Sequence, residues 1–498
     1  MLNERFSSNL KLFVTRITHN RASLVRPREV DSPWLLYHVD KWLPMLLAVV
    51  LSIGLAMLIV DEAWHLAVPV VLLIPAVILF NRYPFIVVVV WLVAAPFIQN
   101  TPTTSIRIMY WLVHRTLLPS ALIVILVADQ LKINKTRSSI KVGRVEWAMI
   151  TTLGLLLLSV FINYKDPLPQ LYIVYDRFFV PFCAYWAIIF SRPTERDLRR
   201  LIPIAFVMVI VEVVIGFMSW YTPQLLPEYW LNAEGRTSAS FQGYSGYTIG
   251  LAFYSLLLFH AAMSRKPGLT RVILLATFSL GVIGIFLSFS RGSWLAVSII
   301  AVGLLFIYPK TTIRLAIVLT IILAVLGGGI MADKLAYAEE RLSTDRTVLD
   351  RYVIYYTSWQ MIKTKPFFGW GYNTYDLYDA QFETRVANHV TNYNHTSHNT
   401  FLTILAEQGA VGFLIYYFPA FWLFALTFKT WSHIPPSGFW SRKLLVVFWL
   451  ILLFYIIVGN FTDTRSDTFV ATILWMTLGF IAVLLTSFQQ PAILKAGD

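Results

Sequence analysis

A histidine followed by an asparagine and two spaced glycines is the clearest candidate for chemistry in this chain. His398 and Asn399 are followed by nine residues and then by the segment 409–412, which reads Gly-Ala-Val-Gly. An imidazole has an ordinary pKa near about 6.5, so at neutral pH it can take the proton of a hydroxyl, which is otherwise a poor nucleophile. The sequence therefore predicts a general base at His398.

A zinc site is the alternative chemistry for the same region. His389 and His395 lie within ten residues of His398, and Asp379 or Glu383 can supply a carboxylate ligand. These histidines lack the i, i+4 spacing of a helical zinc motif, and the single cysteine lies in an apolar stretch. We therefore expect neither a metal nor another cofactor.

The elements that must position His398 are membrane helices. Hydrophobic residues make up 57% of the 498 residues and charged residues only 13%, whereas soluble domains are about 25% charged. The composition predicts an all-α polytopic membrane protein with about 12–14 transmembrane helices. Candidate spans lie near 42–60, 65–80, 84–98, 109–128, 147–163, 171–190, 201–220, 246–263, 272–289, 292–308, 315–332, 410–428, 444–460 and 469–487.

The placement of basic residues predicts the orientation of these spans. Of the 40 lysines and arginines, 26 fall in the N-terminal segment, the tail and alternate loops, which is typical of cytoplasmic segments. We therefore expect both termini in the cytoplasm and the long polar segment 333–398 outside. Orientation also explains the net charge of +13, so no nucleic-acid partner is expected.

The predicted organisation has five parts. They are a basic cytoplasmic segment at 1–41, transmembrane helices 1 to 11 at 42–332, a large external catalytic loop at 333–409, C-terminal transmembrane helices at 410–487, and a cytoplasmic tail at 488–498.

The external loop contains two predicted features close to His398. Residues 333–365 mix apolar and charged types at helical spacing and stop before Pro366, and Gly369-Trp370-Gly371 is typical of a tight turn. After His398, residues 399–408 predict a short surface helix that is capped by Ser397 or Asn399 and ended by Gly409. The true span is expected to start after Gly409, where Gly412 allows close packing.

The chain resembles the bacterial O-antigen ligase and polymerase superfamily of membrane glycosyltransferases. The resemblance rests on His398-Asn399, nine residues and Gly409 to Gly412, together with the turn at Gly369 and Gly371. Arg351 about one helix before that turn and Arg291 at the outer end of an earlier span add to it. Similarity is concentrated in residues 230–430.

The resemblance implies a GT-C-like fold and transfer of a glycan from an undecaprenyl-diphosphate carrier, outside the cytoplasmic membrane. The acceptor hydroxyl belongs to a glycan, a glycolipid or a protein. In this family His398 would be the base, while Arg291 and Arg351 would hold the diphosphate, with Arg346 as a competing match for Arg351. Guanidinium groups meet phosphate oxygens two at a time, which suits a leaving group that gains negative charge. No Asp-x-Asp occurs in the chain, so we expect transfer without a metal. Because no nucleophile is evident, we also expect direct displacement with inversion.

Each arginine also has a purely structural interpretation. Arg236 lies in the polar segment 235–243, where the family often carries an Arg- and Gly-rich stretch before its central helices, but the expected Pro-Asn is replaced by Tyr-Ser at 244–245. Arg291 can anchor a helix end at lipid headgroups. Arg346 and Arg351 can pair with neighbouring acidic residues on a solvated face.

Charged residues inside the spans need partners. Arg115, Asp176, Arg177 and Glu212 are costly to hold in hydrocarbon. Arg115 and Asp176 predict either an ion pair that stabilises packing or part of a cavity that binds the carrier.

Two functional classes remain at this point. The leading one is a lipid-linked glycan polymerase or ligase. The alternative is a transporter or flippase for a lipid-linked or small anionic substrate, which should place its key polar groups at mid-membrane on broken helices.

Overall fold

The protein is an all-α helical bundle in a computed structural model that describes residues 79–80, 82–99, 103–130, 142–231, 236–241, 243–328, 346–382 and 397–488. By its internal contacts the chain divides into two units, Met1–Ala76 and Val77–Asp498. The predicted segment 1–41, the span 42–60 and nearly all of the span 65–80 lie outside the described residues, as does nearly all of the tail. The description below concerns the second unit.

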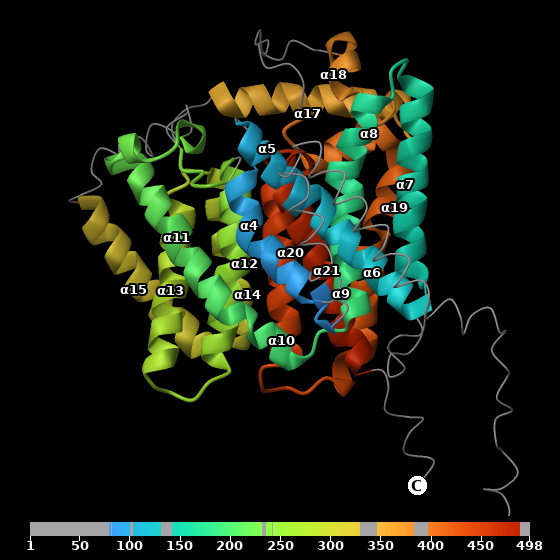
Figure 1. Cartoon of the computed structure of the whole chain (residues 1–498). Helices are drawn as coiled ribbons and strands as arrows, with labels where there is room; N and C mark the ends of the chain where they lie inside the picture. The colour runs from blue at the N-terminus through green and yellow to red at the C-terminus, as the bar shows by residue number, and fades with distance from the viewer. Residues whose placement is uncertain are drawn as a thin grey trace, which may run out of the picture. The chain divides into compact units, whose positions relative to one another are not determined.

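The described residues form helices and no strands (Figure 1). In chain order the helices are α4 (Ile86–Ile98), α5 (Thr104–Tyr110), the π-helical η1 (Trp111–Leu117), α6 (Leu118–Gln130), α7 (Arg144–Asn163), α8 (Leu168–Val174), the π-helical η2 (Tyr175–Phe179), α9 (Val180–Ser191), α10 (Glu195–Arg199), α11 (Leu201–Tyr221), α12 (Tyr244–Met263), α13 (Leu269–Phe286), α14 (Arg291–Ile307), α15 (Pro309–Gly328), α17 (Arg346–Thr364), α18 (Tyr375–Tyr378), α19 (Thr400–Thr430), α20 (Arg442–Gly459) and α21 (Thr468–Ser487). Single 3-10 turns at Pro223–Leu225, Glu228–Trp230, Asp379–Gln381, Trp431–His433 and Thr464–Ser466 join some of them.

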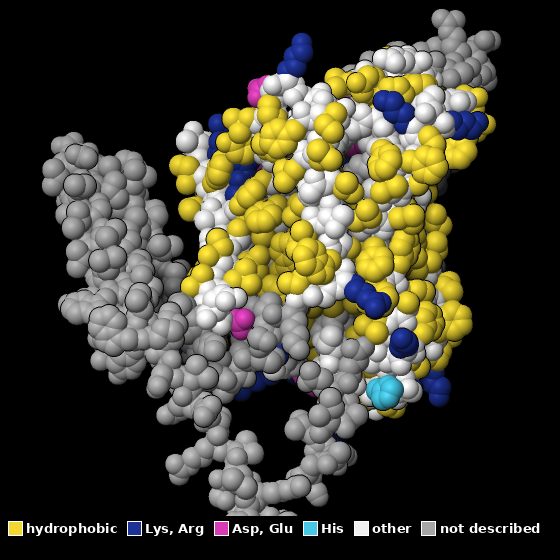
Figure 2. Space-filling model, turned by 90° about the vertical axis from the view of Figure 1, so that its right-hand side faces the viewer, with side chains coloured by type: hydrophobic (Ala, Val, Ile, Leu, Met, Phe, Trp, Pro, Cys, Tyr) yellow, Lys and Arg dark blue, Asp and Glu magenta, His cyan; other side chains and the backbone are white. Residues whose placement is uncertain are grey.

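The prediction of a polytopic membrane protein is confirmed. Within the described ranges, nine helices are long and apolar enough to cross a membrane, and α4 and α14 are shorter apolar helices. Figure 2 shows a broad belt of hydrophobic side chains over one face, with most Lys and Arg toward its two ends. Such a belt is what a hydrocarbon layer requires, because an exposed apolar surface of this size is unfavourable in water.

The predicted span boundaries need two corrections. The span expected at 109–128 begins already at Thr104, where Thr103 accepts a hydrogen bond from the Ile106 N–H (3.3 Å) and so caps α5. The predicted inner loop at 309–314 is instead the beginning of α15, and only Tyr308 separates α14 from α15. Pro309 fits this position because the first residue of a helix needs no N–H partner.

Two helices form the centre of the bundle. In the apolar stretches of α12 and α21, 94% and 100% of the residues are buried, so these two helices are enclosed by the others. On α21 the hydroxyls of Thr472 and Thr477 donate to the carbonyls of Thr468 and Ile473, at 2.7 Å each. These two hydroxyls are therefore buried with their hydrogen bonds made inside the helix.

One end of the bundle is covered by α17. This helix runs across the top of the bundle in Figure 1, where α18 and the start of α19 also lie. Its buried face, with Val353, Ile354 and Met361, packs toward α19. We call this end the His398 end. From Arg346 on, the predicted helix before Pro366 is confirmed by α17, which stops at Thr364, while residues 333–345 of that prediction lie outside the described residues.

Candidate active site

His398 has a strained backbone conformation and lies between two buried neighbours. Its φ is +46°, which is uncommon for a residue with a Cβ and occurs where surrounding contacts hold the backbone. Ser397 and Asn399 are buried, and the Ser397 hydroxyl accepts from the Asn399 N–H (3.1 Å) and donates to the Asn399 carbonyl (2.7 Å). His398 itself is half-buried. The local fold therefore locks the backbone and leaves the imidazole at the surface of the site.

Asn399 is the N-cap of α19. The sequence predicted either Ser397 or Asn399 in this role. Its side-chain oxygen accepts from the N–H groups of Phe401 (2.9 Å) and Leu402 (3.1 Å). An N-cap oxygen satisfies N–H groups that have no partner within the helix. The helix thus begins immediately after His398 and fixes its position relative to the bundle.

The helix that follows breaks at Gly409, as predicted. Gly409 has φ +65° and ψ −173° inside α19, so the carbonyls before it lose their helical partners. The carbonyl of Ala406 accepts from the Trp370 N–H (2.9 Å), and that of Glu407 accepts from the Gly371 N–H (2.7 Å). The turn around Trp370 therefore replaces the missing helical hydrogen bonds.

The same turn satisfies the other side of the break. The N–H groups of Ala410 and Val411 donate to the carbonyls of Pro366 (2.8 Å) and Phe367 (3.1 Å). The two backbones approach so closely that a Cβ on Gly369 would lie 2.3 Å from the carbonyl carbon of Glu407. Gly369 and Gly371 both have positive φ, +67° and +117°. Glycine is therefore required at Gly369 in the turn and at Gly409 in α19, where the two backbones lie closest.

Three of the predicted arginines gather at the His398 end. The positive charges of Arg351 and Arg236 act on the Arg291 guanidinium, which places the three side chains close together. Arg236 lies over the ring of Tyr244, with its Cζ 4.6 Å from the ring centroid. All three are half-buried. We call Arg236, Arg291 and Arg351 the arginine cluster.

Separate elements hold each member of this cluster. Arg291 is the first residue of α14, which Ser290 caps by accepting from the Ser293 N–H (3.4 Å). Arg236 lies in the segment 236–241, and that segment is tied to α11 because Ser240 donates through its hydroxyl to buried Glu212 (2.6 Å). Glu212 thus has a partner within the membrane and a role in positioning the Arg236 segment.

The Asn460–Asp467 loop joins the arginine cluster to the histidine motif. Arg351 lies over the ring of Phe461, 5.3 Å from Cζ to the centroid, and a Cβ on Gly292 would lie 2.6 Å from that ring. The Asn460 carbonyl accepts from the Asn399 amide (3.3 Å) and from the Tyr355 hydroxyl. Residues of α14, of α17 and of the N-cap of α19 therefore meet at two neighbouring residues of this loop, Asn460 and Phe461.

A buried ion network fixes this loop. Arg465, only 5% exposed, donates to both carboxylate oxygens of Asp463 (3.1 and 2.9 Å) and to Glu407 of α19 (2.9 Å). Burial alone would raise the pKa of Asp463, but the charge and hydrogen bonds of Arg465 lower it below its usual range. Asp467 instead caps α21 through the N–H groups of Phe469 and Val470, and burial raises its pKa to about 6.

The predicted ion pair within the spans is present. Arg115 donates to Asp176 through two bonds of 2.7 and 2.5 Å, and it stacks on Trp111 at 4.2 Å. Arg115 lies on η1 and Asp176 on η2, two π-helical segments that contact each other. Arg177, also on η2, lies near Asp463. The bidentate pair and the ring contact join the two π-helical segments, as the ion-pair alternative predicted.

The sequence analysis missed the Asn460–Asp467 loop. A usable signal was present, because three charged residues fall within eight positions between two apolar spans. Arg346 is the first residue of α17, but its side chain is not described. His389, His395 and Glu383 of the zinc alternative lie outside the described residues, and no group of three potential ligands occurs among the residues that the structure covers.

Comparison with known proteins assigns a family to the middle of the chain. Residues 276–417 match the family model described as O-antigen ligase. This range contains Arg291, Arg351 and His398, as well as the turn and the helix break that meet near the site. A comparison with curated proteins gives no match.

Proposed function

Since the chain belongs to the O-antigen ligase and polymerase superfamily and spans the membrane many times, we propose that it transfers a glycan from an undecaprenyl-diphosphate-linked donor to an acceptor hydroxyl, with His398 as the general base. Glycan transfer of the ligase or polymerase type follows from the family. The donor, the residues and the mechanism are our proposal. The acceptor is a glycan, a glycolipid or a protein.

One observation carries this proposal. The arginine cluster and the histidine motif meet at the same loop, because Arg351 rests on Phe461 while Asn399 binds the neighbouring Asn460. A cluster of guanidinium groups attracts an anion such as a diphosphate, and an imidazole beside it can act on a hydroxyl. The site thus contains both functions that glycan transfer from a lipid diphosphate requires.

The chemistry balances without a further reactant. The acceptor oxygen forms a bond to the anomeric carbon as the bond from that carbon to the diphosphate oxygen breaks. The hydroxyl proton passes to the His398 imidazole, and the leaving diphosphate keeps the electron pair. The arginine cluster stabilises the negative charge that grows on the leaving group. A single displacement of this kind inverts the anomeric configuration, and it needs no divalent ion.

We place the His398 end on the outer face of the cytoplasmic membrane. Basic residues of the connections at the opposite end, such as Arg192, Arg265 and Lys443, support a cytoplasmic location for that end. The transporter alternative gains no support from the charged residues within the described spans. Arg115 and Asp176 pair with each other, and Glu212 binds Ser240.

Replacement of His398 tests the proposal. We expect His398→Ala to lower glycan transfer from a purified polyprenyl-diphosphate donor by about 10²-fold or more, since that is the usual contribution of a general base. The matched control is His433→Ala, because His433 is an exposed histidine at the opposite end. Both variants should insert and melt like the unmodified protein. Undiminished transfer by His398→Ala would overturn the proposed role.

A further inference from the structure

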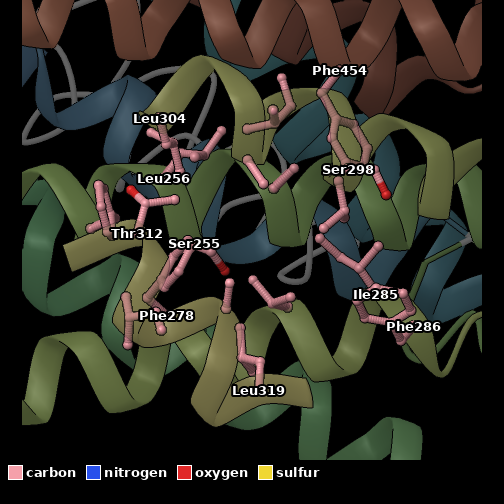
Figure 3. Close-up of a pocket in the computed structure, with 18 of the residues that line it drawn as sticks. Ser255, Leu256, Phe278, Ile285, Phe286, Ser298, Leu304, Thr312, Leu319 and Phe454 are labelled. Atoms are coloured by element: carbon pink, nitrogen blue, oxygen red, sulfur yellow. The ribbon is translucent and has the colours of Figure 1, made fainter. Parts of the chain in front are cut away.

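An apolar cavity of about 290 Å³ lies between α12, α13, α14, α15 and α20 (Figure 3). Its walls include Leu256, Phe278, Ile285, Leu319 and Phe454. Figure 3 shows these side chains arranged around an open centre. The cavity belongs to a different part of the bundle from the loop that carries Asn460 and Phe461. We call it the α15 slot.

The hydroxyl groups on α14 and α15 do not make the slot polar. The hydroxyls of Thr312 and Thr320 donate to the carbonyls of Tyr308 and Ala316, each at 2.9 Å, within their own helix. Ser298 likewise donates to the Trp294 carbonyl at 3.0 Å. A hydroxyl that is already bonded to its own backbone presents mainly carbon to a neighbour. Ser255 of α12 also lines the slot, and its buried hydroxyl has no hydrogen-bond partner among the described residues, so the otherwise apolar wall carries one unpaired hydroxyl. A wall with one such group still suits a hydrocarbon better than a sugar or an ion, which needs several polar partners.

The slot is elongated along the helices. On α15 its lining runs from Thr312 to Leu323, and on α13 it runs from Phe278 to Phe286. At 1.5 Å of rise per residue these stretches are about 16 Å and about 12 Å long, close to half of the roughly 30 Å hydrocarbon core of a bilayer. A long narrow shape in this orientation fits a lipid chain.

One limit of the slot lies near the first turn of α14, which begins at Arg291 of the arginine cluster. Phe286, at one limit of the lining, accepts through its carbonyl from the indole N–H of Trp294 (2.9 Å). Trp294 is in the first turn of α14, which begins with Arg291. On α14 the lining begins at Val297, about 9 Å of helix rise beyond Arg291. A molecule with a diphosphate at the arginine cluster can therefore place its chain in the slot.

We propose that the α15 slot binds the hydrocarbon chain of the lipid-linked donor while the arginine cluster holds its diphosphate. This inference rests on the proposed function. The chain enters sideways from the bilayer past α15, whose side chains Ile317 and Ile321 face outward and are more than half exposed. Burial of the chain in the slot orients the diphosphate toward Arg291 before the acceptor arrives.

Crosslinking with a photoreactive donor analogue tests the inference without requiring transfer. The probe is a polyprenyl diphosphate with a diazirine near the middle of its chain, added to the full-length protein in nanodiscs. We expect the label on lining residues of α13 to α15, located by peptide mass spectrometry. Label confined to the outward-facing positions of these helices would overturn the inference.

Filling the slot provides a matched pair of variants. Ala301 lines the slot, whereas Val302 beside it on α14 is 54% exposed. Ala301→Trp should lower slot labelling about fivefold or more, as overpacking of a filled cavity implies, while Val302→Trp leaves labelling unchanged. Ala301→Leu, which fills less space, should give an intermediate loss and serves if the tryptophan variant does not fold. Equal labelling in all variants would overturn the inference.

Two further arms separate this inference from the alternatives. A phosphatidylglycerol probe with the same diazirine should label the slot weakly, and equal labelling would show an ordinary bilayer lipid there and overturn the inference. In a transfer assay, Ala301→Trp should be impaired with a long-chain donor and normal with a water-soluble short-chain donor. If the unmodified protein transfers from neither donor but the donor probe still labels the slot, the proposed function fails and the slot assignment stands.

Discussion

Arg465 belongs to the Asn460–Asp467 loop and Arg351 packs against the same loop, and the two arginines are held in opposite ways. Arg465 is buried and makes hydrogen bonds to two carboxylates, those of Asp463 and Glu407. Arg351 is half-buried on the ring of Phe461, close to the like charge of Arg291. The described contacts of Arg351 include no carboxylate.

This difference separates a structural arginine from one that we propose to bind an anion. The donors of Arg465 are used by the protein itself, so the residue holds α19 to the Asn460–Asp467 loop. In the arginine cluster, the charges of Arg351 and Arg236 act on Arg291, and under the proposed function a bound diphosphate would offset this repulsion. On this proposal the same side chain serves stability in one place and binding in the other.

The largest expected effect is on stability at Arg465. Arg465→Met leaves two buried carboxylates without their cation, which typically costs about 3–5 kcal/mol of unfolding free energy. We expect a large fall in the thermal unfolding midpoint in detergent, together with loss of transfer. The control is Arg199→Met, because Arg199 forms an exposed pair with Glu195 that contributes about 0.5 kcal/mol or less. Equal midpoints for the two variants would contradict the structural role.

The reverse pattern is expected at Arg351. Arg351→Gln should lower kcat/KM for transfer by about 10²-fold to 10³-fold, as loss of one stabilising donor does in other enzymes. The unfolding midpoint should stay the same or rise slightly, since a repulsive charge is removed. Arg144→Gln is the matched control, because Arg144 also lies over a ring, that of Trp422, but near the opposite end. A stability loss at Arg351 with normal transfer would reverse the comparison.

A smaller effect is expected from two aspartates of the same loop. Asp463 has a cation partner and a lowered pKa, whereas the described partners of Asp467 are two backbone N–H groups and its pKa is raised to about 6. The folded protein therefore binds a proton at Asp467 between pH values near 3.8 and 6, and its stability falls as pH rises through this window.

Asp467→Asn should remove this fall, because the amide keeps an oxygen for the N-cap and carries no charge. Near pH 7 the variant should exceed the unmodified protein by about 3 kcal/mol, and the two should converge near pH 4. Thermal unfolding midpoints across this pH range measure the gap. Parallel pH profiles for the two proteins would show that the Asp467 carboxyl does not drive the dependence.

Much of the fold was predictable because apolar runs and glycines act locally. Within the described ranges, the nine span-length helices and the two shorter apolar helices all match predicted spans, and Gly409 was correctly identified as the break in α19. The start of α15 was predicted at residue 315 and lies at Pro309, because Lys310 and Arg314 are typical of a loop. Their long side chains can nevertheless extend from a helix end to water.

The site was predictable only in part, because its geometry depends on distant segments. The sequence indicated His398, Arg291 and Arg351 as separate residues, but nothing local predicts that Asn460 and Phe461 connect them. Asn460 follows Asn399 by 61 positions, and a single amide in a short loop carries no periodic pattern. The choice between Arg351 and Arg346 remains a prediction, because only the first has described side-chain contacts.

The single residue between α14 and α15 determines how the two helices can separate. Tyr308 is buried, its hydroxyl contacts the His260 ring at 3.3 Å, and Lys443 lies over its ring at 4.6 Å. These contacts fix the connection between α14 and α15. The two helices are thus held together at the end opposite Arg291, so a hydrocarbon chain that enters sideways past α15 would part them more easily toward Arg291 than at Tyr308.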